Sequence, residues 1–321
     1  MRKLAKAVVL ATALISSAAF AQDYPSRIVK FIVPFGPGGP ADVAARLIGK
    51  DLQESLKQSF IVENRTGAGA VIGTAEAAKA PPDGYTLLVI SNTQTANESL
   101  IPARNYELMR DFVAISPINE SDLVIVAHPS VNAKNVQELI ALAKAQPGKL
   151  NYASSGQGTP YHMAGELFKA MTGTNIVHVP HRNSGEARAS VLGGQVEIMI
   201  DAVPAMAQNI AAGQVKPLAT TGKTRSTVLP DVPTVDEAGV KGYEATIWLG
   251  LVAPAGTPKQ VVEKLAAEVK GVVGKPENVK MWASQGALPV SMTPAEFDKF
   301  LRDDIVKWAG VVKLINESAK K

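Results

Sequence analysis

A pattern of alternating strands and helices occurs twice along the chain and constrains its fold more than any other feature. Short runs rich in β-branched residues alternate with amphipathic stretches between residues 28 and 91, and again between residues 150 and 201. Each set has the order strand, helix, strand, helix, strand, which is typical of a parallel sheet with helices on both faces. We therefore predict an α/β fold of two lobes, each a mainly parallel sheet flanked by helices.

The length of the chain supports the same division. It has 321 residues, of which 46% are hydrophobic, and a chain of this size is too long for one ordinary core. We predict that lobe 1 comprises residues 22–123 plus 248–321, and that lobe 2 comprises residues 124–247. Crossings near residues 123–127 and 248–253 would form a hinge, with a ligand cleft between the lobes.

The first 21 residues are typical of a secretory signal peptide. Arg2, Lys3 and Lys6 precede an apolar run, and Ala19, Phe20 and Ala21 supply the small–x–small pattern of a cleavage site. The apolar run is shorter than the roughly 20 residues that span a bilayer. We therefore predict export to the periplasm without a lipid anchor, because no cysteine is available to carry one.

The charge of the mature chain argues against a nucleic-acid partner. Of the 33 Lys and Arg residues, three lie in the predicted signal peptide, which leaves 30 against 29 Asp and Glu. Aromatic residues make up only 5%, whereas nucleic-acid recognition needs a clustered basic face, often with aromatic side chains that stack on bases. The absence of cysteine also excludes disulfides, so folding must depend on the apolar core.

Two glycine-rich loops mark the predicted ligand site. Residues 35–40 (Phe-Gly-Pro-Gly-Gly-Pro) and residues 154–159 (Ser-Ser-Gly-Gln-Gly-Thr) each follow a strand and run into a helix. Ligands of open parallel sheets bind outside the carboxyl ends of the strands, and the unpaired N–H groups of a helix amino end attract an anion. Each loop alone would equally fit a tight turn, but two at equivalent positions predict a clamp for a carboxylate.

Three other kinds of site fit the sequence less well. Residues 67–73 lack the GxGxxG spacing and the acidic residue of a dinucleotide site. Ser155 and His162 lack a nucleophile elbow and a third partner, which disfavours a hydrolase. His178 and His181 lie on a strand-to-loop segment that would not bring both rings to one zinc ion. We predict no cofactor, no metal and no enzymatic activity.

Two acidic residues have both a structural and a ligand-binding interpretation. Asp201 ends a strand at the predicted ligand edge, where it would either accept a hydrogen bond from a ligand ammonium or amide, or cap the local backbone. Asp42 lies in the first turn of a helix, where carboxylates commonly stabilise the helix dipole. For Asp42 the structural interpretation is favoured.

Six short sequence stretches, taken together, indicate a protein family. They are residues 34–39 (Pro-Phe-Gly-Pro-Gly-Gly) with Asp42, residues 62–65 (Val-Glu-Asn-Arg) with 67–69 (Gly-Ala-Gly), residues 82–87 (Pro-Asp-Gly-Tyr-Thr-Leu), residues 148–156 (Gly-Lys-Leu-Asn-Tyr-Ala-Ser-Ser-Gly), residues 192–196 (Leu-Gly-Gly-Gln-Val) and residues 251–258 (Leu-Val-Ala-Pro-Ala-Gly-Thr-Pro). Through them the chain resembles the tripartite tricarboxylate transporter receptors (the TctC or Bug family) over essentially the whole mature length.

The resemblance implies a type II-like periplasmic binding protein fold that closes on its ligand, and transfer of that ligand to membrane permease subunits rather than catalysis. In this family the first and fourth stretches hold a ligand carboxylate through backbone amides and bridging water. The positions that inherit this role are Phe35, Gly38, Gly39, Ser154, Ser155, Gly158 and Thr159. The positions that would line the rest of the site are Thr93, Thr95, His162 and Asp201.

One loop departs from the family pattern. The family usually has Val-Pro-Tyr followed by a basic residue and glycine, whereas residues 179–183 here are Val-Pro-His-Arg-Asn. The loop faces the variable end of the ligand, where His181 would either donate to a second polar group or replace a packing tyrosine. Arg182 is either a ligand contact or surface charge. We predict a small mono- or dicarboxylate as the ligand, with an aromatic acid or an amide less favoured.

The predicted function is therefore that of a monomeric receptor that delivers a small carboxylate-bearing solute to integral membrane permease subunits. Two other classes of function remain open at this stage. One is a ligand-sensing partner of a membrane histidine kinase, which would use the same ligand chemistry. The other, less favoured, is a periplasmic hydrolase.

Overall fold

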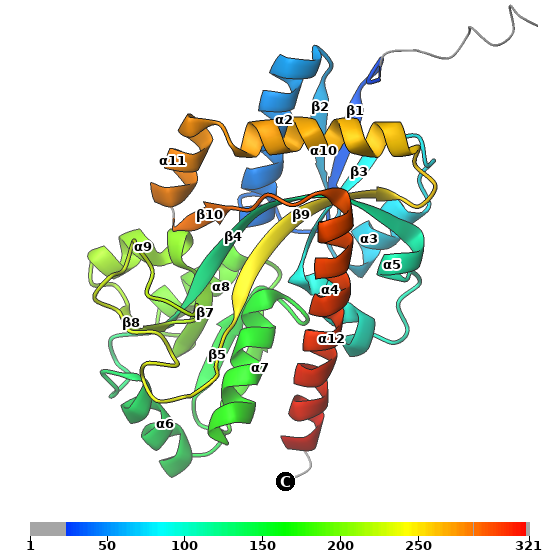
Figure 1. Ribbon diagram of the computed structural model, residues 1–321. Coiled ribbons are helices and arrows are strands. Elements are labelled where there is room, and N and C mark those ends of the chain that lie inside the picture. Colours follow the sequence, from blue (N-terminus) through cyan, green and yellow to red (C-terminus); the bar gives the residue numbers. More distant parts are fainter. Residues whose placement is uncertain (1–23, 285, 319–321) are drawn as a thin grey trace, which may run out of the picture.

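The chain folds into two lobes, each with a β-sheet that has helices on both faces (Figure 1). The structure is a computed structural model that describes residues 24–284 and 286–318. The predicted signal peptide, residues 1–21, lies outside the described residues. Within them, no helix is both long enough and apolar enough to cross a membrane.

The first lobe contains the first predicted set of strands and helices. Its three parallel strands have the order β2-β1-β3, with the first strand in the middle. They are β1 (Val29–Val33), β2 (Phe60–Asn64) and β3 (Thr86–Ser91). The helices α2 (Pro40–Leu56) and α3 (Val71–Ala78) connect them. This is the predicted parallel unit.

The second lobe repeats this arrangement. Its parallel strands have the order β7-β5-β6, again with the first strand in the middle. They are β5 (Asn151–Ser154), β6 (Val177–Pro180) and β7 (Ile198–Ala202). The helices α7 (Pro160–Thr172) and α8 (Ser184–Leu192) connect them. The α/β architecture predicted from the repeated pattern is confirmed.

The two crossings predicted near residues 123–127 and 248–253 lie within two long antiparallel strands, which the predicted strand–helix pattern did not include. They are β4 (Phe112–Ala127) and β9 (Thr246–Pro254). The last pair between them is Asp122 with Thr246, whereas Leu123 already pairs with Ala202 of the second lobe. The short strands β8 (Lys216–Thr220) and β10 (Ala287–Pro289) also pair with β4. A single strand therefore belongs to both sheets and ties them together.

Local signals in the sequence explain several helix boundaries. Helix α2 has proline at its first position and ends where Lys57 adopts a left-handed conformation. Helix α12 begins at a capping box in which Thr293 and Glu296 bond to each other's backbone. The other helices are α4 (Asn92–Leu100), α5 (Leu108–Asp111), α6 (Val136–Ala145), α9 (Val203–Ala211), α10 (Lys259–Val273), α11 (Pro276–Ser284) and α12 (Pro294–Ser318).

Each sheet buries apolar side chains on both faces. In the first lobe, Phe31 packs on one side of β1 and its neighbour Ile32 on the other, because successive strand residues point to opposite faces. In the second lobe, Ile125 and Val126 of β4 likewise pack on opposite faces of the sheet. Such two-sided burial explains why the strands read as continuous apolar runs.

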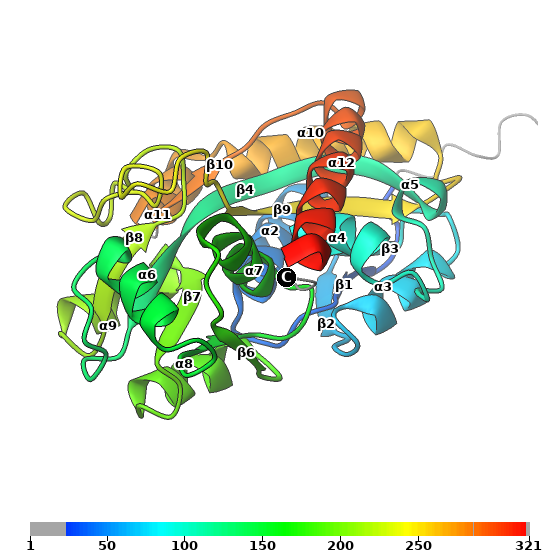
Figure 2. The ribbon, with the colours of Figure 1, turned by 90° about the horizontal axis from the view of Figure 1, so that it is seen from below.

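Helix α12 contacts both lobes. Trp308 is 1% exposed and packs in a small cluster with Ala96 of α4, in the first lobe, and Met163 of α7, in the second. Figure 2 shows the end of α12 beside α4 and α7. The C-terminal helix is therefore a third connection between the lobes, after β4 and β9.

Candidate functional site

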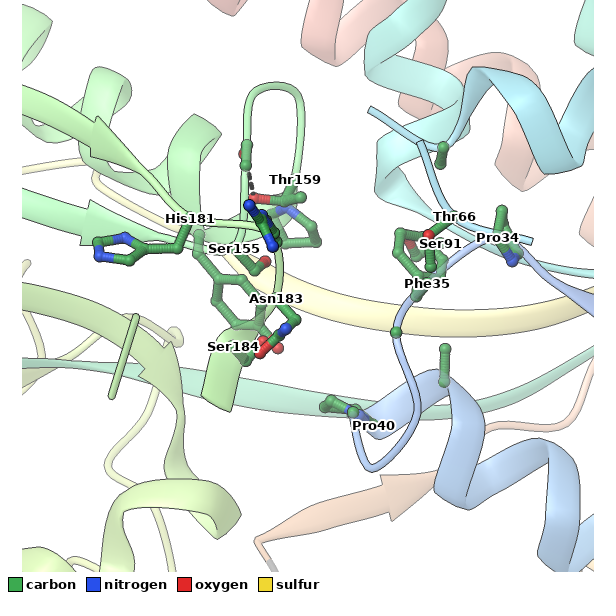
Figure 3. A pocket seen from close by; sticks show the side chains of 18 of the residues that line it. Pro34, Phe35, Pro40, Thr66, Ser91, Ser155, Thr159, His181, Asn183 and Ser184 are labelled. Carbon is green, nitrogen blue, oxygen red and sulfur yellow. Dashed lines mark hydrogen bonds between the residues drawn. The ribbon is translucent and has the colours of Figure 1, made fainter. Parts of the chain in front are cut away.

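A cleft of about 580 Å³ lies between the two lobes. Figure 3 shows Phe35 and Thr66 on one side of it and Ser155 and Asn183 on the other. Its loops follow β1, β2, β5 and β6, at the carboxyl ends of parallel strands where ligands of open sheets bind. The lining consists of residues 34–41, 66–70, 91, 155–156, 159–161, 181–185, 188, 247 and 249.

The cleft lining carries positive side-chain charge and no negative side-chain charge. Arg182 and Arg188 are its cationic residues, and no Asp or Glu is among the residues that line it. The first residues of three helices, Pro40, Pro160 and Ser184, also line the cleft. Because the amino end of a helix carries a partial positive charge, the cleft favours an anionic solute.

A buried carboxylate fixes the first glycine-rich loop. Asp42 accepts hydrogen bonds from the Gly38 amide at 2.9 Å and from Asn64 Nδ2 at 3.0 Å. It also accepts one from the Arg46 guanidinium at 2.9 Å. Burial alone would raise the pKa of Asp42, but these bonds hold that pKa below its ordinary value. Asp42 therefore stays charged and holds the loop, in agreement with its structural interpretation.

Two adjacent histidines support the second glycine-rich loop from behind. His178 Nε2 lies 2.6 Å from Ser154 Oγ, and the ring centroids of His178 and His162 are 4.3 Å apart. His162 Nδ1 accepts a hydrogen bond from the Gly158 amide at 3.2 Å. Burial lowers the pKa of His178 to about 3 and also lowers the pKa of His162. Both rings are therefore neutral at pH 7, which lets His162 accept this bond.

The cleft amides that have no hydrogen-bond partner differ from those that the glycine pattern predicted. Four loop amides bond within their own loop and helix start, and these are Gly38, Gly39, Gly158 and Thr159. Four other cleft amides make no hydrogen bond to any described residue, and these are Gly36, Ala41, Ser155 and Tyr161. The glycines thus turn the chain, while the open donors lie at the loop starts and in the first helical turns.

The loop that leads into α3 forms a further wall of the cleft. Gly67, Ala68, Gly69 and Ala70 have φ values of 130°, 47°, 62° and 72°, a conformation that costs energy for alanine. A Cβ on Gly69 would lie 2.8 Å from the Gln157 carbonyl oxygen of the second lobe. Glycine at this position therefore lets the two lobes meet, a role that the sequence analysis did not consider.

Half of the twelve predicted site positions line the cleft. These are Phe35, Gly38, Gly39, Ser155, Thr159 and His181. The positions that do not line it are Thr93, Thr95, Ser154, Gly158, His162 and Asp201. Ser154 and Gly158 belong to the second loop itself and His162 lies behind it, and the hydrogen bonds described above shape the loop. Direct contact between a solute and the six lining residues stays a prediction.

The structure corrects the placement of Thr93 and Thr95. Ser91 Oγ accepts a hydrogen bond from the Thr93 amide at 3.1 Å, and Gln94 Oε1 accepts one from the Ser91 amide. This capping box starts α4 directly after β3. Both threonines are buried in the helix, and Thr95 Oγ1 donates to Asp304 at 2.6 Å. The spacing of Ser91 and Gln94 was a signal that the sequence analysis missed.

Asp201 is fully buried and is already paired. It accepts hydrogen bonds from Arg188 Nε and from the Ala202 amide, both at 2.8 Å. Burial raises the pKa of Asp201 to about 6, and the Arg188 charge opposes the rise, so the carboxylate is ionised at pH 7. Asp201 therefore holds Arg188, and its complete burial keeps it from contact with a ligand ammonium in the cleft.

Several residues that line the cleft were missing from the predicted set. They include Thr66, Tyr161, Asn183, Ser184 and Arg188. Asn183 caps α8 by accepting from the Glu186 amide at 2.9 Å, and this spacing could have shown that a helix starts there. No local sequence signal marked Arg188 as a cleft residue, because only the packing of α8 against β7 brings it to Asp201.

The described residues do not bring together the groups that were considered for a metal site or for the Ser155–His162 pair. No group of three or more His, Cys, Asp and Glu side chains among them could hold a metal ion. Likewise no hydrogen bond between described residues joins Ser155 to His162, whose Nδ1 is used by the Gly158 amide. The geometry is that of a binding cleft between two lobes, which defines the class of two-lobed solute-binding proteins.

Comparison with known proteins places the chain within this class. The family model described as "Tripartite tricarboxylate transporter family receptor" matches residues 44–317. The chain therefore belongs to this family, and the predicted resemblance is confirmed. Receptors of this family are solute-binding proteins and not, in general, enzymes.

Individual relatives are similar over nearly their whole length. The protein BugT of Bordetella pertussis (strain Tohama I / ATCC BAA-589 / NCTC 13251) is 38% identical over 308 residues, which cover 95% of this chain and 94% of BugT. A solved R. palustris protein with adipate is 34% identical, with a TM-score of 0.88 over 92% of this chain and 99% of that one. MatC from Rhodopseudomonas palustris with bound malate is 30% identical, with a TM-score of 0.85 over 90% of this chain and 100% of MatC.

Proposed function

We propose that the chain is an extracytoplasmic receptor that captures a small carboxylate-bearing solute and delivers it to the permease subunits of a tripartite tricarboxylate-type transporter. The observation that carries this proposal is the pair of opposed helix amino ends. Ala41 of α2 and Tyr161 of α7 each present an open amide to a cleft without acidic side chains. Backbone amides and helix dipoles of this kind bind carboxylates. The adipate and malate bound by two structural relatives support the same solute class.

Binding measurements test the first half of this proposal. The purified mature protein is titrated calorimetrically with mono-, di- and tricarboxylates, and with the corresponding amides as uncharged controls. A bound solute raises the free energy of unfolding by RT ln(1 + [L]/Kd), about 2.7 kcal/mol at a hundredfold excess over Kd. We expect saturable binding of at least one carboxylate and no binding of its fully amidated form. Equal binding of both forms would contradict the proposal.

The location and the partner are part of the same proposal. We expect mass spectrometry of the exported protein to find an N-terminus at Gln22, and light scattering to find a monomer. Cross-linking of the solute-loaded receptor in membranes should capture permease subunits. Capture of a histidine kinase in their place would favour the sensor alternative.

The lobe division also stays a proposal, with residues 22–123 and 248–321 in one lobe and residues 124–247 in the other. The exchange of partners along β4 between Asp122 and Leu123 supports a hinge there. We expect X-ray scattering to show a smaller radius of gyration with a saturating carboxylate than without it. An unchanged radius would contradict closure around the hinge.

A further inference from the structure

Arg188 is the cleft residue whose side chain a fully buried carboxylate holds in place. It lies on α8 four residues after Ser184, and both residues line the cleft, as expected for positions on one helix face. Arg188 Nε donates to Asp201 Oδ2 at 2.8 Å. The Asp201 side chain is 0% exposed, whereas that of Arg188 keeps 25% of its surface. The pair therefore has a buried end and an open end.

The hydrogen bond to Asp201 uses one of the five N–H groups of the guanidinium. The remaining four belong to Nη1 and Nη2, and they make no hydrogen bond to any described residue. These two groups form the fork that binds a carboxylate through two parallel bonds. The Asp201 contact restrains the guanidinium before a solute arrives, which reduces the entropy lost on binding.

A purely structural role would be a weak explanation for this ion pair. Burying two charges costs about as much as their attraction returns, and apolar residues of similar volume often stabilise a fold as well or better. The same corner of the cleft also contains an unsatisfied donor. Tyr161 Oη is buried and makes no hydrogen bond to a described residue, although its residue lines the cleft. The Tyr161 hydroxyl and the two outer nitrogens of Arg188 therefore make no hydrogen bond to a described residue.

We infer that Arg188, positioned by Asp201, binds a second acidic group of the solute, so that the cleft selects a dicarboxylate over the matching monocarboxylate. This inference rests on the proposed function, in which the first carboxylate meets the open amides of α2 and α7. Arg188 is then the specificity-determining residue at the other end of the solute. Asp201 acts through Arg188 and is a positioning residue.

The test compares dicarboxylates with their monoamides, which keep the length and lose one charge. Calorimetry with succinate, malate, glutarate and adipate, each beside its monoamide, gives the ratio of the two Kd values for each pair. We expect the wild type to bind the best dicarboxylate at least tenfold more tightly than its monoamide. Arg188→Leu should weaken dicarboxylate binding by about 10- to 100-fold, the worth of hydrogen bonds to a charged group, and change monoamide binding by less than about threefold.

A second arginine offers a matched control. Arg225 also donates from Nε to a carboxylate, that of Glu237, at 2.8 Å, but at a surface position outside the cleft lining. We expect Arg225→Leu to keep the wild-type ratio. Arg188→Leu leaves Asp201 buried without a partner, so the double variant Arg188→Leu/Asp201→Asn, which has no buried unpaired charge, is measured beside it and should lose the same discrimination.

The possible outcomes separate the two proposals. If the wild type binds no carboxylate, the proposed function itself fails. If the wild type binds a dicarboxylate and the folded Arg188 variants keep the wild-type ratio, the inference about Arg188 is overturned and the proposed function stands. If the wild type binds each monoamide as tightly as its dicarboxylate, the inference about Arg188 is also overturned.

Discussion

Single polar residues, one buried and one partly buried, shape the two sides of the cleft from behind. Asp42 holds the first glycine-rich loop through the Gly38 amide, and His178 holds the second through Ser154. Neither Asp42 nor His178 lines the cleft. Because an unpaired polar group in the interior costs free energy, each of these residues is effective only in one protonation state, charged for Asp42 and neutral for His178.

Removal of the Asp42 carboxylate should loosen the first loop. Asp42→Ala leaves the Gly38 amide and Asn64 Nδ2 without their acceptor, so we expect a loss of about 1–3 kcal/mol in the free energy of unfolding together with weaker solute binding. Asp298→Ala is a matched control, since Asp298 also pairs with an arginine four residues on, but at the surface. Its expected cost in urea unfolding is below about 1 kcal/mol. Equal losses would show that the loop contacts contribute nothing.

Acid should destabilise the second lobe through His178. An unfolded histidine takes up a proton near pH 6.5, whereas burial, with the neighbouring His162, lowers the pKa of folded His178 to about 3. Between these values the unfolded state binds the extra proton, so the free energy of unfolding falls as pH drops from about 6.5 towards 3. We expect His178→Gln to show a shallower fall than the wild type in urea unfolding at several pH values. An identical fall would contradict the assignment.

At the scale of elements, close approach of backbone segments decides where glycine is needed. The loop before α3 meets the second lobe at Gly69, where a Cβ would lie 2.8 Å from the Gln157 carbonyl oxygen. In the second lobe, a Cβ on Gly158 would likewise lie 2.8 Å from Asn97 Oδ1 of α4, which belongs to the first lobe. These contacts join the two lobes, so they require the lobes to be close together.

Gly69→Ala should therefore weaken solute binding more than it weakens folding. Gly213 is a matched control, because its φ of +68° resembles the +62° of Gly69 and a Cβ there meets nothing within 4 Å. Both alanine variants should lose more than about 0.4–1 kcal/mol of stability from the left-handed backbone. Only Gly69→Ala should also raise the Kd of a bound carboxylate in calorimetry. A similar rise in Gly213→Ala would contradict this explanation.

At the scale of the whole molecule, three connections join the lobes. β4 pairs in both sheets, β9 pairs with β3 and β4 in the first sheet and reaches the core of the second lobe at Ile247, and α12 contacts both lobes through Trp308. The aromatic ring packs against Ala96 and Met163, which belong to different lobes. We therefore expect lobe closure to depend on the packing of the C-terminal half of the helix.

Trp308→Ala should affect both folding and closure. Truncation of a buried tryptophan costs about 3–5 kcal/mol, and in this case it also removes the contact shared by the two lobes. Trp282→Ala is the control, since Trp282 is 2% exposed in the core of the first lobe alone. We expect similar losses in urea unfolding for both variants, but a changed radius of gyration without solute only for Trp308→Ala. The same radius in both would contradict a coupling role.

The sequence by itself determined the local architecture of this protein. The two strand–helix repeats, the glycine-rich loops and the capping box at Thr293 depend on contacts between residues close in the chain, and such contacts leave periodic or short patterns. The motifs also identified the family. Six of the predicted site positions, at the loops that follow β1, β5 and β6, line the cleft. The start of α4 was equally local and was overlooked.

Only the tertiary structure decided what the cleft presents to a solute. Arg188 and Asp201 are thirteen positions apart, and Thr95 and Asp304 are separated by most of the chain, so no local pattern links either pair. The joining of both sheets by β4 is likewise a pairing between distant segments. Whether a polar side chain faces the solute or is already satisfied depends on partners that folding brings together, and for Asp201 that partner is Arg188.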